Sequence, residues 1–338
     1  MDINVNSAII VTDSDLIKYF TGFEADDAFL IIYNNENHLF VDNRYYYATK
    51  NLNGVKSYLI NETSLSSFLC ENNIKSVGLV YGYTNANYVD KLNKMNVSYF
   101  DASNYVYDKM AVKTQAELSV IKKACEIAEK SFYQLLPLIK EGVLERDLKL
   151  ELEYLMGKNG AEGPSFNTIV AFRENSAVPH HKTGESKLTK NSAILIDFGC
   201  VYKGYLSDMT RTMFFGTPSS EFLNVYKAVQ KAHLTASSEI KCGITAKDAD
   251  KIARDVLKEY GYSEYFTHSL GHGVGVKIHE APTLGRKSDY LLRNGNVFSI
   301  EPGVYLDGKF GVRIEDTYAL IDGKCVSMMT SDKNPIII

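Results

Sequence analysis

The chain has 338 residues, of which 45% are hydrophobic and 23% are charged, and its formal net charge is −4. These ordinary globular values exclude intrinsically disordered and fibrous proteins. The slightly acidic balance and the lack of a Lys/Arg-rich run argue against nucleic acid as a partner. No apolar run in the sequence approaches the roughly 18 residues that a membrane span requires, so we expect no membrane association.

The N-terminus and the cysteines indicate a cytoplasmic protein. The opening segment MDINVNSAIIVTDSD has no basic start ahead of an apolar stretch, so we expect no signal peptide. The five cysteines lie far apart and form no Cys-x-x-Cys pair. This usage is typical of reduced cytosolic thiols rather than of a disulfide framework.

The first part of the chain predicts a small α/β domain over residues 1–110. Its asparagine-rich cluster at 34–37 is typical of a turn between two strands. The predicted strands are 28–33, 38–41 and 77–81, and the predicted helices lie near 64–70 and 87–92.

A capping-box pattern opens a helical segment after this domain. Thr114 can accept a hydrogen bond from the backbone of Glu117, whose side chain can reach back. Apolar residues then recur at helical spacing from Leu118 to Phe132. Further helices are predicted from Glu145 to a stop at Gly157, along the stripe 222–236, and over 248–260 before Gly261.

Strand-like runs lie between and after these helices, at 193–198, 205–215, 297–300 and 312–320. Strands and helices come in blocks rather than in strict alternation. The second domain, over residues 111–338, is therefore predicted to be α+β with an antiparallel sheet.

Two aspartates are the first candidates for chemistry. The midpoint between Asp197 and Asp208 falls between Tyr202 and Lys203, just before Gly204, a residue suited to a turn. A hairpin turning there would place the two carboxylates nearly opposite each other, roughly 5 Å apart. Two carboxylates at that range repel each other, and a cation between them would remove the repulsion.

Three later residues extend this set: His272 in GHGVG, Glu301 in IEPGVY and Glu315 in RIED. Any one of these acids alone is typical of the protein surface. With neutral histidine the set carries four negative charges, which two divalent cations would balance. Paired metals are a known hydrolytic device. Oxygen-rich ligation favours Mn²⁺, with Zn²⁺ or Co²⁺ as alternatives.

These motifs, in this order, resemble the creatinase/aminopeptidase P/prolidase family, and most of all a bacterial-type Xaa-Pro aminopeptidase. The matching segments are KYFTGF (18–23), VDNRYY (41–46), GPSFNTIVA (163–171), VPHH (178–181), DFGCVYKGYLSDMTRT (197–212), HSLGHGVGVKIHEAP (268–282), EPGVY (301–305) and RIED (313–316). The resemblance therefore covers almost the whole chain.

The resemblance implies a creatinase-type N-terminal domain and a pita-bread catalytic domain, whose curved antiparallel sheet is flanked by helices. It implies that two metal ions per chain are held by Asp197, Asp208, His272, Glu301 and Glu315. It also implies catalytic roles for His180, His268, His279, Glu301 and Arg313. His268 and His279 are expected to donate hydrogen bonds as charge develops on the substrate. Other histidines, such as His233, match no motif and are interpreted as structural or surface residues.

Several matched positions leave alternatives open. Arg313 shares a strand face with Glu315, where it would contact substrate, orient a ligand through a salt bridge, or both. Tyr305 matches a family tyrosine, although packing is the default role in so tyrosine-rich a chain. His181 is interpreted as a rim residue beside His180.

One segment departs from the family pattern. Family members commonly read VASG where this chain reads VAFR, so Phe172 and Arg173 replace a small pair. At the mouth of a cleft, these residues would narrow the pocket or offer a cation to a substrate carboxylate.

The resemblance implies an Xaa-Pro aminopeptidase, acting on peptides with proline at the second position and forming a homodimer. The alternative within the family is an Xaa-Pro dipeptidase (prolidase), which uses the same ligands. A non-catalytic binding protein on the same fold would be expected to have lost ligands, whereas all five are present.

Overall fold

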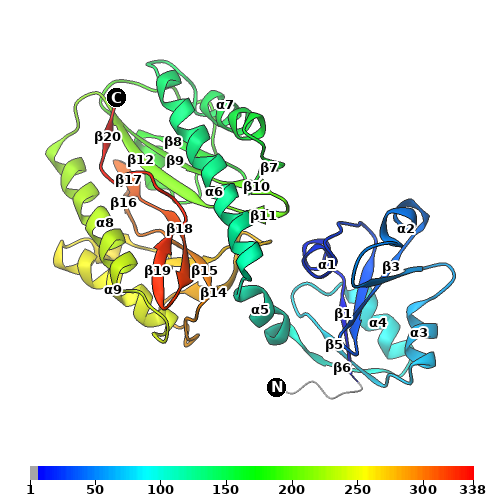
Figure 1. The fold of residues 1–338 in the computed structure, drawn as a ribbon. Coiled ribbons are helices and arrows are strands. Elements are labelled where there is room, and N and C mark those ends of the chain that lie inside the picture. Colours follow the sequence, from blue (N-terminus) through cyan, green and yellow to red (C-terminus); the bar gives the residue numbers. More distant parts are fainter. Residues whose placement is uncertain (1–6) are drawn as a thin grey trace. The chain divides into compact units, whose positions relative to one another are not determined.

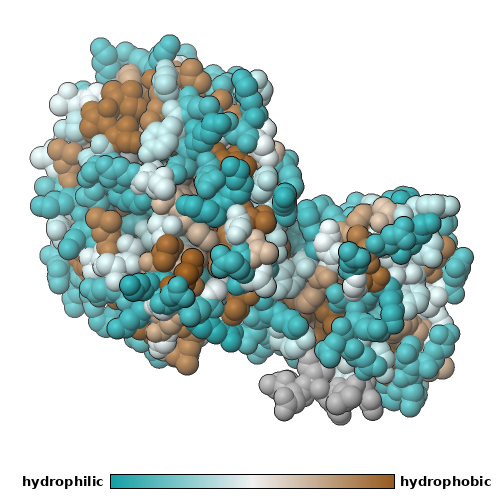
Figure 2. Space-filling view, in the orientation of Figure 1, coloured by the Kyte–Doolittle hydropathy of each residue, from teal (hydrophilic) through white to brown (hydrophobic). Residues whose placement is uncertain are grey.

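The computed structural model describes residues 7–338 and divides the chain into two compact units, Met1–Lys109 and Met110–Ile338. The first six residues, on which the expected lack of a signal peptide partly rests, lie outside the described part. Across residues 7–338, no helix combines the length and apolar character of a membrane span. In Figure 2, hydrophilic and neutral residues cover most of the visible face, and hydrophobic residues form separate groups.

The first unit is a six-stranded sheet accompanied by helices (Figure 1). Its strands are β1 (Ala8–Val11), β2 (Phe29–Tyr33), β3 (Glu36–Val41), β4 (Val55–Leu59), β5 (Ser76–Leu79) and β6 (Ser98–Asp101). Its helices are α1 (Ser14–Thr21), α2 (Asn43–Thr49), α3 (Leu65–Glu71) and α4 (Ala86–Lys94), and α5 (Ser103–Ala111) leads into the second unit. The strand order is β4-β3-β2-β1-β5-β6.

Local sequence explains the hairpin in this sheet. Asn34 and Asn35 both have positive φ, 51° and 60°, and form the two-residue turn between β2 and β3. Asparagine tolerates this left-handed conformation better than most residues. The predicted turn at 34–37 therefore becomes a two-residue turn, with Glu36 and Asn37 already in β3.

The second unit has four long helices and three 3₁₀ turns. The helices are α6 (Gln115–Leu135), α7 (Glu145–Lys158), α8 (Ser220–Glu239) and α9 (Ala246–Glu259), and the turns are η1 (Leu136–Leu138), η2 (Arg173–Ala177) and η3 (Ser263–Tyr265). The predicted capping box is present: Thr114 Oγ1 accepts from Glu117 N at 3.3 Å, and Glu117 Oε2 accepts from Thr114 N at 2.8 Å. The α7 helix runs one residue past Gly157, its predicted end.

The strands of the second unit form two main sheets and two small ones. The first main sheet has the order β20-β12-β9-β8 and the second β14-β13-β15-β18-β19, while β11-β10-β7 and β16-β17 are small. Their bounds are β7 (Gly163–Pro164), β8 (Ile169–Phe172), β9 (Ser192–Phe198), β10 (Cys200–Tyr202), β11 (Tyr205–Leu206), β12 (Met209–Phe215), β13 (Gly271–Gly273), β14 (Glu280–Leu284), β15 (Val297–Ile300), β16 (Gly303–Leu306), β17 (Phe310–Arg313), β18 (Asp316–Ile321), β19 (Lys324–Ser327) and β20 (Ile336–Ile337). All recorded pairings here are antiparallel except that of β12 with β20.

Each main sheet is backed by its own helix pair. In Figure 1, α6 and α7 lie on one side of the strands and α8 and α9 on the other. The first pair shares an apolar core with β9 and β12, where Phe132 stacks on Phe198 with ring centroids 5.5 Å apart. The second pair packs on β15 and β18. The predicted α+β fold with an antiparallel sheet flanked by helices is confirmed.

The hairpin between the two candidate aspartates has a different register from the predicted one. Lys203 and Gly204, with φ of 48° and 76°, form a two-residue turn, one position later than expected. Asp197 therefore pairs with Thr210, and Asp208 lies two residues before that partner, just ahead of β12. The predicted register, which placed the two aspartates nearly opposite each other, was wrong by two residues, although Asp197 and Asp208 still share a face.

Stability should depend on the core between α6 and β9. Because the Phe132 side chain is fully buried against Phe198, Phe132→Ala should lower the free energy of unfolding by about 3–5 kcal/mol. The control is Tyr133→Ala on the same helix, where the side chain is 45% exposed and the change should stay within about 0.5 kcal/mol. Urea unfolding followed by far-UV circular dichroism measures both. Equal losses would contradict this assignment of the core.

Candidate metal centre

The five predicted ligands lie on strands or immediately beside them. Asp197 is in β9, Asp208 precedes β12, His272 is in β13, Glu301 follows β15 and Glu315 precedes β18. Thr210 and Glu315 form an isolated antiparallel bridge, which joins the first main sheet to the segment that leads into β18. The two main sheets thus contribute ligands to one place.

Four of these side chains form a direct cluster. Ligand atoms of Asp208, His272 and Glu315 lie within 4.8 Å of one another. His272 Nε2 is 3.5 Å from Asp208 Oδ2 and 3.3 Å from Glu301 Oε1. Asp197 is linked to the cluster through Arg313, whose Nη2 donates to Asp197 Oδ2 at 2.6 Å.

Burial makes the negative charges of this cluster unfavourable on their own. Loss of hydration, followed by the repulsion of neighbouring carboxylates, raises the pKa values of Asp208 and Glu315 well above their ordinary range. Burial also raises the pKa of Glu301 to about 7, against the opposing charge of Arg313. A cation among these groups would favour their charged forms.

The donor atoms fit a divalent cation. Asp197 Oδ1 is buried and has no hydrogen-bond partner among residues 7–338. Such an oxygen is costly to leave unpaired, and a metal ion would satisfy it. Carboxylate oxygens with one imidazole suit divalent cations such as Mn²⁺ or Zn²⁺ better than soft Cu⁺.

A glycine allows the close packing of strands around His272. A β-carbon at Gly271 would lie 1.9 Å from the carbonyl oxygen of Ser299, so no larger residue fits there. This approach lets the backbone N–H of His272 donate to Ser299 Oγ at 3.1 Å. The same hydroxyl donates to Glu301 Oε1 at 3.1 Å, which ties two predicted ligands together.

The structure places His268 and His279 close to the predicted ligands. His268 Nδ1 is 3.9 Å from Glu301 Oε2, and the His279 ring meets the His272 ring edge-on with centroids 4.2 Å apart. The His180 side chain is exposed in the segment after η2. His233, in contrast, is fully buried and contacts Tyr318 OH at 2.8 Å, which agrees with its interpretation as a structural residue.

Tyr305 makes polar contacts rather than serving only in packing. Its hydroxyl accepts from Arg313 Nη1 at 2.8 Å and lies 2.9 Å from His268 Nε2. Burial lowers the pKa of His268 to about 3, so its ring is neutral. Because His268 Nδ1 lies 2.8 Å from the Ser269 carbonyl, it is the donor nitrogen, and Nε2 accepts from the tyrosine. Arg313, Tyr305 and His268 therefore form one connected line of hydrogen bonds.

Two threonines also hold the ligands, and neither was singled out from the sequence. Thr210 Oγ1 donates to Glu315 Oε2 at 2.6 Å and accepts from Arg313 Nε at 3.0 Å. Thr317 Oγ1 donates to the Asp208 carbonyl at 2.9 Å. Each lies two residues from a predicted ligand, on the same strand face. That spacing could have identified them.

Glu145 organises the segment that carries His180. Its fully buried carboxylate accepts from Phe172 N at 2.9 Å and from Asn175 Nδ2 at 2.8 Å. Its other oxygen lies 3.0 Å from His181 Nε2. His181, interpreted as a rim residue, is thus fixed to the start of α7. Phe172 is buried and does not narrow an opening.

A buried charge network supports the Glu315 main chain from behind. Arg211, which is 1% exposed, donates from Nη1 to the Glu315 carbonyl and from Nη2 to Asp316 Oδ1, both at 2.7 Å. Lys333 forms an ion pair with the other oxygen of Asp316. Arg211 and Lys333 hold the pKa of the Asp316 carboxyl below its usual range, despite full burial. The backbone position of Glu315 therefore depends on Lys333, which acts through Asp316.

A sheet-based unit that gathers four carboxylates and a histidine around one point has the architecture of a metal-dependent hydrolase. Comparison with known families agrees. Residues 119–322 match the model of metallopeptidase family M24, and residues 2–110 match the creatinase/prolidase N-terminal domain. The chain belongs to metallopeptidase family M24.

Individual relatives span most of the chain. An Xaa-Pro dipeptidase of Pyrococcus horikoshii is 42% identical over 250 residues, which are 72% of this chain and 70% of that protein. The structure of an Xaa-Pro dipeptidase from Bacillus anthracis superimposes with a TM-score of 0.92 at 33% identity, covering 98% of this chain and 95% of the other. An X-Pro aminopeptidase from Thermotoga maritima gives 0.90 at 31% identity, covering 98% and 97%.

The comparisons confirm the family, the pita-bread fold and a hydrolase, which favours an enzyme over a non-catalytic binding protein. They also bear on the choice between the two peptidase activities. Two of the relatives described above are Xaa-Pro dipeptidases, which favours the alternative over the aminopeptidase. The sequence left this choice open because both activities use the same ligands.

Removing the Thr210 hydroxyl should weaken metal binding. Thr210→Val leaves Glu315 Oε2 and Arg313 Nε without their shared partner, so affinity for Mn²⁺ should fall about 10–100-fold. The matched control is Thr235→Val, because Thr235 Oγ1 has no hydrogen-bond partner among the described residues. Competition of each variant with a Mn²⁺ chelator gives the affinities. If both variants bind Mn²⁺ like the wild type, the assigned role of Thr210 is wrong.

Proposed function

We propose that the chain is a metal-dependent Xaa-Pro dipeptidase that releases the first residue of a dipeptide ending in proline. The observation that carries this proposal is the similarity of most of the chain to Xaa-Pro dipeptidases. The peptide bond before proline lacks an N–H, and the ring fixes the backbone, so this bond requires a dedicated site.

The metals would be held by Asp197, Asp208, His272, Glu301 and Glu315. Bound divalent cations supply Lewis acidity and a nucleophilic water at neutral pH. Mn²⁺ suits the oxygen-rich donor set, with Zn²⁺ or Co²⁺ as alternatives. Two ions balance the four carboxylates of the set, whereas one would leave a net negative charge in a buried site.

The remaining site residues act on protons and on the substrate. Glu301 accepts a proton from the attacking water and then donates it to the departing proline nitrogen. His279 and His180 donate hydrogen bonds to the substrate carbonyl as negative charge develops on its oxygen. Arg313 holds Asp197 and Tyr305, and Tyr305 in turn fixes the ring of His268. His268 is thereby oriented towards the substrate beside Glu301.

We infer the cellular location, the oligomeric state and the substrates of the enzyme from the same family relationship. The chain is proposed to act in the cytoplasm as a homodimer on small peptides with proline at the second position. Light scattering of the purified protein measures the mass in solution and tests the dimer directly.

Metal content should be two ions per chain. Dialysis against a chelator should abolish hydrolysis, and Mn²⁺ should restore it, because the carboxylates at 208 and 315 otherwise repel each other within a buried site. Elemental analysis after reconstitution with Mn²⁺, Co²⁺ or Zn²⁺ counts the ions. Full activity at one ion per chain would contradict the paired-metal centre.

Substrate length separates the two activities. With Mn²⁺, the enzyme should release alanine from Ala-Pro at least about tenfold faster than from Ala-Pro-Ala-Ala, as the loss of one charged contact would cause. Asp208→Ala is the inactive control, since it removes a predicted ligand. Faster cleavage of the tetrapeptide would instead favour the aminopeptidase, the activity of the Thermotoga maritima relative. Cleavage of neither peptide with any of the three metals would refute the Xaa-Pro activity.

A further inference from the structure

The segment that carries His268 lies outside the regular elements of the second unit. Residues 266–270 connect η3 with β13 and belong to no helix or strand. The segment nevertheless borders the candidate metal centre, because His268 Nδ1 is 3.9 Å from Glu301 Oε2. Its backbone meets the same residue, since the Leu270 carbonyl accepts from Glu301 N at 2.8 Å. Contacts with other elements therefore decide where this segment lies.

One edge of the segment is bonded to helix α9. The backbone at Phe266 is extended, with φ of −97° and ψ of 93°. In extended backbone, alternate residues direct their polar groups to the same side. The carbonyls of Phe266 and His268 and the N–H of Leu270 stand at alternate positions, and all three bond to side chains of α9. The helix thus takes the place that a neighbouring strand has in a sheet.

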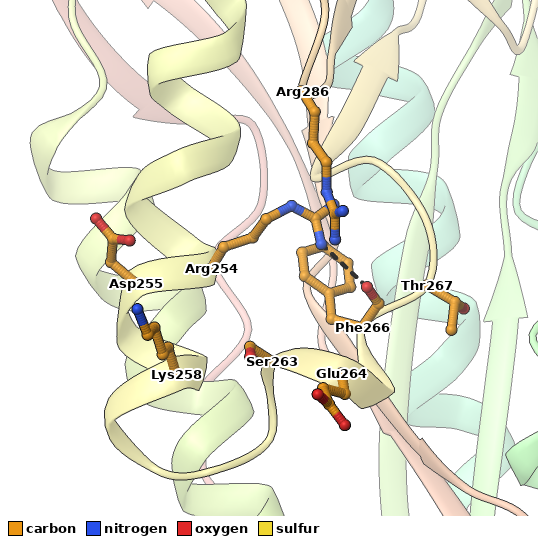
Figure 3. Close-up of a pocket in the computed structure, with 8 residues that line it drawn as sticks. All are labelled: Arg254, Asp255, Lys258, Ser263, Glu264, Phe266, Thr267 and Arg286. Carbon is orange, nitrogen blue, oxygen red and sulfur yellow. Dashed lines mark hydrogen bonds between the residues drawn. The ribbon is translucent and has the colours of Figure 1, made fainter.

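These bonds come from Asp250 and Arg254, which lie one helical turn apart. Arg254 Nη1 donates to the Phe266 carbonyl at 3.0 Å, drawn as a dashed line in Figure 3, and Nη2 donates to the His268 carbonyl. Asp250 Oδ1 accepts from Leu270 N at 2.9 Å. Oδ1 and Oδ2 of Asp250 also accept from Arg254, at 3.0 and 2.6 Å, so the two side chains form one bonded pair.

The Asp250–Arg254 pair is largely shielded from water. The Asp250 side chain is 1% exposed and that of Arg254 is 14% exposed. A carboxylate so buried needs a cation and hydrogen-bond donors to remain charged. The guanidinium also lies over the Phe266 ring, 4.2 Å from its centre, and that ring meets the His268 ring edge-on at 4.9 Å. Arg254 therefore reaches His268 both through its carbonyl and through the ring beside its side chain.

A second ion pair of α9 shows what distinguishes the first. Lys251 and Asp255 have the same four-residue spacing, but their side chains are 67% and 55% exposed. A solvated pair of this kind contributes little to structure. The guanidinium of Arg254 instead serves one carboxylate and two carbonyls at once, with a rigid fork of N–H donors. A lysine ammonium, which acts as a point charge, does not reproduce that geometry.

We propose that Asp250 and Arg254 are positioning residues, which set the backbone of residues 266–270 and with it the ring of His268 beside Glu301. The inference rests on the proposed function, because it concerns the reaction at that same centre. A misplacement of about 1 Å can lower the rate of an enzyme roughly 100-fold. A shift of this segment should therefore be measurable in kcat.

The first test is Arg254→Lys, which keeps a positive charge next to Asp250 and removes the fork. On the metal-loaded enzyme with Ala-Pro, kcat should fall at least about tenfold, while KM changes less than about threefold. In a His268→Ala background, the same substitution should lower kcat less than about threefold, because its effect passes through His268. Lys251→Gln removes the exposed pair and is the matched control, with the wild-type kcat. Elemental analysis should find equal metal content in Arg254→Lys and the wild type.

The second test asks whether the guanidinium group itself is required. Arg254 lines the pocket of about 580 Å³ that is drawn in Figure 3, through which a small ion can enter. Guanidinium chloride, at concentrations too low to unfold the protein, should restore much of the kcat that Arg254→Ala loses. Ammonium chloride should not, because it lacks the fork of donors. Equal effects of the two salts would contradict the role of the fork.

Hydrogen exchange measures the segment without any substrate. In the metal-loaded protein, the peptide covering 266–270 should exchange at least about tenfold faster in Arg254→Lys than in the wild type or in Lys251→Gln. A wild-type kcat for Arg254→Lys, an equal loss in the His268→Ala background, or unchanged exchange would each overturn the positioning role and leave the proposed function intact. If the wild type cleaves neither Ala-Pro nor Ala-Pro-Ala-Ala, the proposed function fails, and hydrogen exchange alone decides the role of the pair.

Discussion

The second unit depends on one constraint: the carboxylates of the candidate metal centre lie close together in a largely buried site. Asp208 and Glu315 are almost fully buried, and loss of hydration raises both pKa values. Asp208 further raises the pKa of Glu315, and Asp197 and Glu301 further raise that of Asp208. Arg313 is the cation in contact with this group, and its charge is directed at Asp197. One guanidinium cannot balance four acids, so protons or bound cations must neutralise the rest. Bound metal ions would therefore stabilise the folded form of this unit.

The position of the centre follows from how the two main sheets meet. Each sheet has its own apolar core and helix pair, so each is stabilised independently of the ligands. The bridge between Thr210 and Glu315 then sets the two sheets against each other. Because side-chain direction alternates along a strand, a slip of one residue at this bridge would turn the ligands away from one another. The hydroxyl of Thr210, bonded to both Glu315 and Arg313, opposes such a slip.

Much of this could be predicted from the sequence because the signals are local. The capping box at Thr114 and the apolar stripes located the helices of the second unit, and the motif order identified the family. The register between Asp197 and Asp208 could not be predicted, because it depends on which two residues form the turn. Lys203 is an unusual residue for a left-handed position, and the position of Gly204 alone fits more than one turn.

The roles of Glu145 and Tyr305 were hidden for another reason. Their contacts connect residues far apart in the chain, such as Glu145 with Phe172 and Tyr305 with His268. Nothing in the spacing of a single sequence reports such contacts. The predicted metal ligands could be identified from the sequence because each lies in a short motif.

The network behind Glu315 has a consequence for the order in which the molecule forms. Lys333 pairs with Asp316, which also pairs with Arg211, and β12 has β20 as its neighbour on the side away from β9. A ribosome releases the chain from its N-terminal end, so the first unit and α6 emerge long before these residues. The four acidic residues of the candidate metal centre are therefore all synthesised before Lys333. Until that lysine emerges, the pairing that holds Asp316 next to Glu315 cannot be complete.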